Sequence, residues 1–181
     1  MKRNQNKKTR GLIITYTGNG KGKTTASIGL AIRALGRAKR VLIVQFMKSG
    51  TYGEHKILKK IPGIKVKILG KGFCKIAGDQ FPFAEHKKAT QDALNFARRA
   101  VMSKKYDMII LDEINCALLC RLLKVKDVLA LCNRKPRQLH LVLTGRGAPQ
   151  SLIKASDLVS DVREVKHPYY DGMPAQEGIE F

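Results

Sequence analysis

The stretch Thr17–Thr25, TGNGKGKTT, contains the residue types that bind phosphate. Three glycines let consecutive backbone N–H groups turn toward one anion, Lys23 adds positive charge, and the Thr24 hydroxyl can ligate Mg²⁺. The run nearly matches the Walker A pattern G-x-x-x-x-G-K-[ST], but Thr17 stands where the first glycine belongs, which leaves the glycine-bounded loop one residue short. We expect a phosphate-binding loop, and the alternative is a glycine-rich turn that packs a helix against a strand.

Two further groups are suited to the same chemistry. Asp112 and Glu113 follow four apolar residues, as in a Walker B segment, so that one carboxylate can hold the water shell of Mg²⁺ and the other can act as a base or bind a ribose hydroxyl. A helix N-cap is the alternative for this pair. Arg146, between two glycines, can clamp phosphate oxygens or be a surface arginine in a turn. These residues alone predict ATP hydrolysis or phosphoryl transfer, in which Lys23 and Arg146 offset charge on the γ-phosphate and Glu113 orients a water.

The elements that must position these residues alternate between strands and helices. Apolar strands are expected at residues 12–15, 41–44, 66–69, 108–111, 139–143 and 162–165. Helices are expected at residues 24–35 (ended by Gly36), 83–105, 149–156 and, as one helix or two, 116–132. The pattern predicts an α/β fold with a mostly parallel central sheet of about six strands and helices on both faces. The candidate residues all follow strands, and ligands of such sheets collect at the carboxyl ends.

Length and composition limit the remaining possibilities. The 181 residues fit a single nucleotide-binding domain over residues 11–181, preceded by a basic, flexible tail over residues 1–10. There is no run of 18 apolar residues, and the apolar stretch 12–14 is too short for a signal peptide. We therefore expect no membrane partner. Because the cysteines contain no C-x-x-C pair, we expect reduced thiols in a cytoplasmic protein. The four are Cys74, Cys116, Cys120 and Cys132.

The formal net charge of +21 favours phosphate-rich partners such as nucleotides, nucleic acid or an anionic surface. The first ten residues contain five basic residues and no acid, but no aromatic residue interleaves with them. Aromatic residues make up only 6% of the chain, which gives no stacking platform for single strands. We therefore expect no nucleic-acid partner, and a basic RecA-like ATPase that binds nucleic acid is the alternative.

Six segments, in this order, resemble the P-loop ATP:corrinoid adenosyltransferases. They are TGNGKGKTTAS, VLIVQFMKSG, LGKGF, MIILDE, LTGRGAP and VKHPYYDGMPAQEGIEF. The resemblance runs from about Gly11 to the last residue, and GNGKGKTT and AQ-x-GIE are its most specific marks. It implies a RecA-like P-loop fold and transfer of the 5′-deoxyadenosyl group of ATP to the cobalt(I) of a corrinoid, either cobalamin or a precursor. The whole triphosphate leaves, so positive charge must stabilise it where it meets the sugar.

The resemblance also implies a role for each matching residue. ATP contacts are expected from Gly18, Asn19, Gly20, Lys21, Gly22, Lys23, Thr24 and Thr25. Mg²⁺ or Mn²⁺ is expected at Thr24, Asp112 and Glu113. Catalytic roles are expected for Lys23, Glu113 and Arg146. A homodimer and a cobalt-reducing flavoprotein or similar reductant are expected by the same resemblance. We interpret the shorter loop as one that seats the phosphates in a register suited to triphosphate as a leaving group.

The resemblance assigns Phe73 and Lys75 to the corrinoid. In the better-known members a tryptophan stands two residues beyond the phenylalanine, whereas this chain has Lys75 there and no tryptophan at all. A lysine can instead meet an acidic side chain of the corrin ring or a phosphate of its tail. The missing tryptophan leaves a further alternative, a corrinoid-binding protein that has lost transfer activity.

Overall fold

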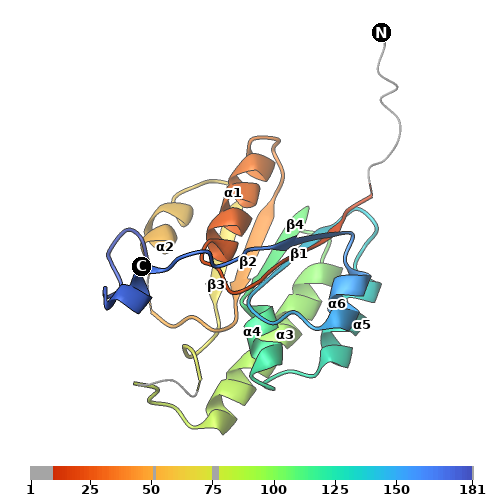
Figure 1. Ribbon diagram of the computed structural model, residues 1–181. Helices are drawn as coiled ribbons and strands as arrows, with labels where there is room; N and C mark the ends of the chain where they lie inside the picture. Colours follow the sequence, from red (N-terminus) through yellow and green to blue (C-terminus); the bar gives the residue numbers. More distant parts are fainter. Residues whose placement is uncertain (1–9, 51, 75–77, 181) are drawn as a thin grey trace.

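The computed structural model describes residues 10–50, 52–74 and 78–180. Its centre is a six-stranded sheet in the order β3-β2-β4-β5-β1-β6 (Figure 1). The strands are β1 (Ile13–Thr17), β2 (Val41–Gln45), β3 (Ile64–Ile68), β4 (Met108–Asp112), β5 (His140–Thr144) and β6 (Leu158–Asp161). Every strand pairing in the described part is parallel, which confirms the predicted α/β sheet and places all the carboxyl ends at one edge.

Helices cover both faces of this sheet, as predicted. They are α1 (Lys23–Leu35), α2 (Gly53–Leu58), α3 (Phe83–Met102), α4 (Ile114–Leu119), α5 (Val125–Arg134), α6 (Gln150–Ala155) and the 3₁₀ helix η1 (Pro168–Asp171). Helices α1 and α2 pack on one face, and α3 to α6 pack on the other. None of the helices in the described ranges is long and apolar enough to cross a membrane.

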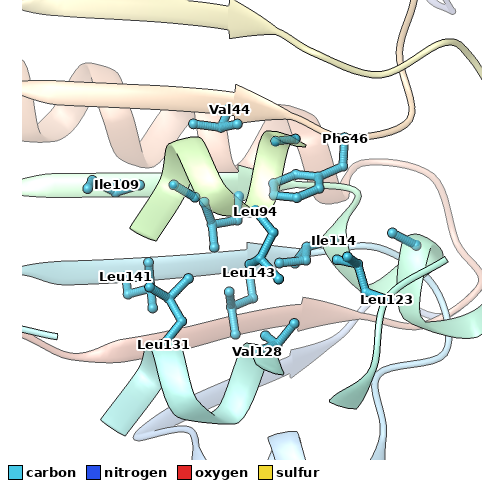
Figure 2. Close-up of a cluster of buried hydrophobic side chains, with 14 of the residues drawn as sticks. Val44, Phe46, Leu94, Ile109, Ile114, Leu123, Val128, Leu131, Leu141 and Leu143 are labelled. Atoms are coloured by element: carbon cyan, nitrogen blue, oxygen red, sulfur yellow. The ribbon is translucent and has the colours of Figure 1, made fainter. Parts of the chain in front are cut away.

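The larger core lies between the sheet and α3 to α6 (Figure 2). Successive strand residues alternate between the faces, so Leu42 and Val44 enter this core while Val41 and Ile43 pack toward α1. The labelled side chains in the larger core are Val44, Phe46, Leu94, Ile109, Ile114, Leu123, Val128, Leu131, Leu141 and Leu143. This close packing gives the strand ends a rigid base.

The last predicted strand, at residues 162–165, is wrong. The strand is β6, which ends at Asp161 and pairs with β1 through residues 14–17. It lies at the edge of the sheet and is mostly exposed, so burial does not require an apolar run there. The apolar residues that suggested a strand lie beyond it, and Val165 is 95% exposed.

The predicted helical region 116–132 forms two helices, α4 and α5. The chain turns between them at Arg121, whose φ is +59°, and the backbone N–H of Leu122 donates to Ala117 O at 2.9 Å. Helix α2 was not predicted, because six residues are too few to show helical periodicity. Gly36 is the C-cap of α1, as predicted, and α3 ends at Met102 rather than at residue 105.

The basic tail lies outside the described residues except for Arg10, whose guanidinium pairs with Asp157 at 2.7 Å. All four cysteines are described, and none forms a disulfide.

Candidate functional site

The glycine loop connects β1 to α1, as the sequence predicts. Gly18 and Gly22 have φ values of +93° and +115°, which favour glycine. Gly22 is the N-cap of α1, and no side chain makes a capping hydrogen bond there. The first backbone N–H groups of a 13-residue helix can therefore point at an anion, and the helix dipole favours negative charge.

Two of the glycines are also needed for close packing. A Cβ on Gly18 would lie 2.1 Å from Asp161 Oδ1, and one on Gly20 would lie 2.6 Å from Arg163 O. The backbone N–H of Gly20 donates to Val162 O at 2.7 Å. The neighbour that requires these glycines is the end of β6 and the two residues after it, whereas the space around Gly22 is open.

Lys23 begins α1 and is only 6% exposed. Its Nζ donates to Gly20 O at 2.6 Å, which holds the amine against the loop. Burial lowers the pKa of Lys23, and nearby Glu113 opposes this shift. A phosphate beside a partly desolvated amine interacts more strongly than it would at an exposed surface.

Asp112 ends β4 and is fully buried at the centre of the strand ends. Its Oδ1 accepts hydrogen bonds from the hydroxyls of Thr24 at 2.8 Å and Thr144 at 2.7 Å. Its Oδ2 accepts from Gln45 Nε2 at 3.0 Å. The structure therefore brings Thr24 and Asp112 together as predicted, and it joins the ends of β2, β4 and β5 to the start of α1.

Glu113 follows at the N-cap of α4 with φ at +63°. Its side chain makes no capping hydrogen bond, so the geometry does not support the helix-cap alternative. Its Oε2 is buried and has no hydrogen-bond partner among the described residues. Burial raises the pKa of Glu113, and the neighbouring Asp112 raises it further. A carboxylate oxygen in this state is suited to receive a cation.

The oxygen atoms of Thr24, Asp112 and Glu113 are of the types that can hold a magnesium ion. Hydroxyl and carboxylate oxygens, completed by phosphate oxygens and water, are the usual ligands of Mg²⁺. In the described ranges no three His, Cys, Asp or Glu side chains are grouped to hold a metal. Burial raises the pKa of the nearby Cys116 thiol, which favours its protonated form.

The loop after β5 presents Arg146 as an exposed side chain. Its backbone N–H donates to Cys116 Sγ at 3.3 Å, and Asn115 Nδ2 donates to Gly145 O at 3.3 Å. The backbone N–H of Ala148 donates to Thr17 Oγ1 at 3.1 Å. Thr17, which replaces the Walker glycine, therefore anchors the loop that carries the arginine.

Phe73, one of the two predicted corrinoid residues, lies at another part of the edge. Phe73 is 40% exposed and follows β3, while Lys75 lies outside the described residues. A Cβ on Gly70 would lie 2.2 Å from Phe46 O, so this chain packs tightly on the loop after β2. Strands β2, β4 and β5 separate β3 from β1. Four strand spacings amount to about 19 Å, so the strands that precede Phe73 and the glycine loop are well separated at this edge.

Four polar residues at this edge had no predicted role. Gln45 ends an apolar strand, as Asp112 does, and that signal could have identified it. Thr144 begins the TGRG segment, and Thr17 marks the departure from the Walker pattern. His55, on the unpredicted α2, gave no sequence signal.

The sequence that forms this site matches a family of known proteins. The family model described as ATP:corrinoid adenosyltransferase BtuR/CobO/CobP matches residues 9–181, which include the glycine loop, both acidic residues and the arginine loop. The chain belongs to this family. The match confirms the resemblance seen in the six sequence segments.

Individual relatives agree with the family match. The corrinoid adenosyltransferase of Escherichia coli K12 is 36% identical over 174 residues, which cover 95% of this chain and 86% of the relative. Corrinoid adenosyltransferase CobA of Salmonella typhimurium is 34% identical over 179 residues, covering 98% of this chain and 89% of the relative. A solved structure of a KaiC-like protein from Pyrococcus horikoshii superposes with a TM-score of 0.54 at 15% identity, covering 87% of this chain and 75% of that one. That likeness supports the RecA-like fold.

Proposed function

We propose that this protein transfers the 5′-deoxyadenosyl group of ATP to the cobalt(I) of a corrinoid and releases triphosphate. The observation that carries the proposal is the adenosyltransferase family match across residues 9–181. In this reaction cobalt(I) donates an electron pair to the 5′ carbon. The bond from that carbon to the 5′ oxygen breaks, and its electrons leave with the triphosphate.

Lys23, Arg146 and the loop N–H groups bind the triphosphate in this proposal. Negative charge builds on the 5′ oxygen as it leaves, and positive groups fixed nearby stabilise the transition state more than the bound substrate. The buried position of Lys23 strengthens its interaction with that charge. The expected ATP-binding residues Gly18, Asn19, Gly20, Lys21, Gly22, Thr24 and Thr25 surround this lysine in sequence.

Thr24 and Glu113 are the proposed holders of Mg²⁺ or Mn²⁺. Both oxygens of Asp112 already accept protein hydrogen bonds, whereas Glu113 Oε2 has no partner among the described residues. We therefore assign Glu113 as the direct carboxylate ligand and Asp112 as the residue that orients Thr24. When bound, the ion supplies positive charge that offsets the charge of the triphosphate.

Phe73, with Lys75 after it, is the proposed corrinoid contact. An exposed aromatic ring on a chain packed against the β2 end can lie flat against a corrin ring. The strands that precede the nucleotide loop and Phe73 are about 19 Å apart, which leaves room along this edge for a nucleoside triphosphate and a macrocycle together. A cobalt-reducing flavoprotein and a second copy of the chain complete the proposal as partners expected from the family resemblance.

The test combines the protein with ATP, Mg²⁺ and a chemically reduced corrinoid. Appearance of the cobalt–carbon product in the absorbance spectrum, with triphosphate as the phosphate product, supports the proposal. ATP with a non-hydrolysable β–γ bridge should also react, because that bond is not broken. ADP formation stimulated by nucleic acid, without a corrinoid product, would favour the nucleic-acid ATPase instead. Corrinoid binding without product would indicate a carrier that has lost transfer activity.

A further inference from the structure

A chain of buried hydrogen bonds connects Asp112 to α2. Gln45 Nε2 donates to Asp112 Oδ2 at 3.0 Å, and His55 Nε2 lies 2.6 Å from Gln45 Oε1. The backbone N–H of Tyr52 donates to His55 Nδ1 at 3.0 Å. Asp112 and His55 are 0% exposed and Gln45 is 1% exposed, so bulk water does not compete for these bonds.

The direction of each bond follows from the chemistry of the groups. Burial lowers the pKa of His55, which favours the neutral ring. Since Nδ1 accepts from Tyr52, the ring proton lies on Nε2 and is donated to Gln45 Oε1. The Gln45 amide must then present its NH₂ group to Asp112. Without His55, Gln45 Oε1 loses its buried donor, and among the described residues the amide is then held only by its hydrogen bond to Asp112 Oδ2.

The other charged groups around this chain lie farther from Asp112. Lys48 Nζ is 3.9 Å from Asp112 Oδ2 and donates to Glu54 Oε1 at 2.7 Å. Glu54 Oε1 is in turn 3.9 Å from His55 Nε2. These longer separations leave the Gln45 amide as the direct side-chain donor to Oδ2 in the described part of the molecule.

We propose that His55 and Gln45 are positioning residues for the metal-binding part of the site. His55 fixes the orientation of the Gln45 amide, and Gln45 holds the Asp112 carboxylate so that Oδ1 meets the Thr24 hydroxyl. The inference deepens the proposed function and rests on it for the identity of the ligand, Mg²⁺·ATP. Removing a residue that hydrogen-bonds directly to a metal ligand changes metal affinity by about 10- to 100-fold. Asp112 is that residue for Thr24. Gln45 and His55 act through Asp112, so their removal should have a smaller effect.

Two matched variants separate this role from a merely structural one. The amide nitrogen of glutamine can take the place of Nε2, so His55→Gln keeps a donor toward Gln45 and loses the acceptor for Tyr52. The amide oxygen of asparagine can take the place of Nδ1, so His55→Asn keeps the acceptor for Tyr52 and loses the donor toward Gln45. Each variant removes one hydrogen bond, and we expect both to lower the melting temperature by similar amounts.

The experiment is a calorimetric titration of each full-length protein with Mg²⁺·ATP in the absence of corrinoid. His55→Asn should bind several-fold more weakly, up to about tenfold, and His55→Gln should bind like the unchanged protein. Equal affinity of all three proteins, or equal weakening in both variants, would overturn the inference. If the three proteins bind Mg²⁺·ATP as expected but the separate corrinoid assay shows no adenosylation, the proposed function is refuted while the inference about His55 and Gln45 stands.

Gln45→Met provides a second test that leaves the sequence of α2 unchanged. It removes the donor to Asp112 with a side chain of similar length, and it should weaken Mg²⁺·ATP binding as much as His55→Asn does. Because both residues act through one chain of hydrogen bonds, the double variant should bind about as weakly as either single variant. Losses that multiply in the double variant would show independent effects and would contradict the proposed order of action.

Discussion

At the ends of β4 and β5 the polar side chains are buried and hydrogen-bonded to one another, whereas the chain between β3 and α3 carries exposed aromatic rings. Asp112 and Thr144 are 0% exposed, and Phe73 and Phe81 are 40% and 39% exposed. Folding itself thus organises the polar edge, and the aromatic region keeps apolar surface that a planar ligand can cover. In the proposed reaction the first region binds the leaving group and the second binds the nucleophile.

The largest effect should come from the polar edge. Lys23→Ala removes a buried positive charge beside the leaving triphosphate and should lower the transfer rate by about 10³-fold. Lys21→Ala is the comparison within the same loop, because it removes an equal charge from an exposed amine that pairs with Glu180, and its loss of rate should be smaller. Single-turnover formation of the adenosylated corrinoid measures both. Equal losses in the two variants would show that only the net charge of the loop matters.

Glu113→Gln should separate function from stability. Loss of the proposed metal ligand should weaken Mg²⁺ binding by at least about 100-fold. The free protein should become more stable at pH 8 by about 1 kcal/mol, because an unpartnered buried carboxylate oxygen is removed. Mg²⁺ titration and urea unfolding measure the two effects.

The pH dependence of this stability gain has a definite sign. Burial raises the pKa of Glu113, so its contribution to folding is present at low pH and is lost as the pH rises through the folded-state pKa. The stability difference between Glu113→Gln and the unchanged protein should therefore grow from pH 4 to pH 8. The control is Glu85→Gln, because Glu85 is exposed. A stability difference for Glu113→Gln that did not change with pH would argue against a buried carboxylate that destabilises the folded protein.

Phe73→Ala should affect the second region alone. We expect the KM for corrinoid to rise by about tenfold, since a ring contact contributes roughly 1 to 2 kcal/mol, while the KM for ATP stays unchanged. Ile32→Ala, on the exposed side of α1, removes a comparably exposed apolar side chain and should change neither value. An equal rise in both KM values for Phe73→Ala would show that the two regions do not divide the substrates.

The smallest effect is expected from the anchor between β1 and the arginine loop. Thr17→Val leaves the Ala148 N–H without its hydroxyl partner and should lower the transfer rate by about fivefold, as expected for one lost hydrogen bond. Thr17→Ser keeps the hydroxyl and should retain the rate. If the Thr17→Val and Thr17→Ser variants had the same transfer rate, Thr17 would not position Arg146 through this hydrogen bond.

The two regions also differ in how much of their structure and function could be predicted from the sequence. The glycine loop and Asp112 follow apolar strands, and parallel strands bring their carboxyl ends to one edge, so the contact between Thr24 and Asp112 could be expected. The proposed role of Phe73 comes from family resemblance, since an aromatic residue in a loop has no single chemistry. The His55 to Gln45 bond depends on the path of a loop with no periodic pattern. The strand at residues 162–165 was mispredicted because an edge strand needs little apolar character.

The most direct measurement of the central claim follows the 5′ oxygen of ATP. ATP labelled with ¹⁸O at that position is converted in a single turnover with reduced corrinoid, and the products are analysed by mass spectrometry. Adenosyl transfer breaks the bond between the 5′ carbon and this oxygen, so all the label should appear in triphosphate and none in the adenosylated corrinoid. Label recovered in ADP would show cleavage at the γ-phosphate and would contradict the proposed reaction.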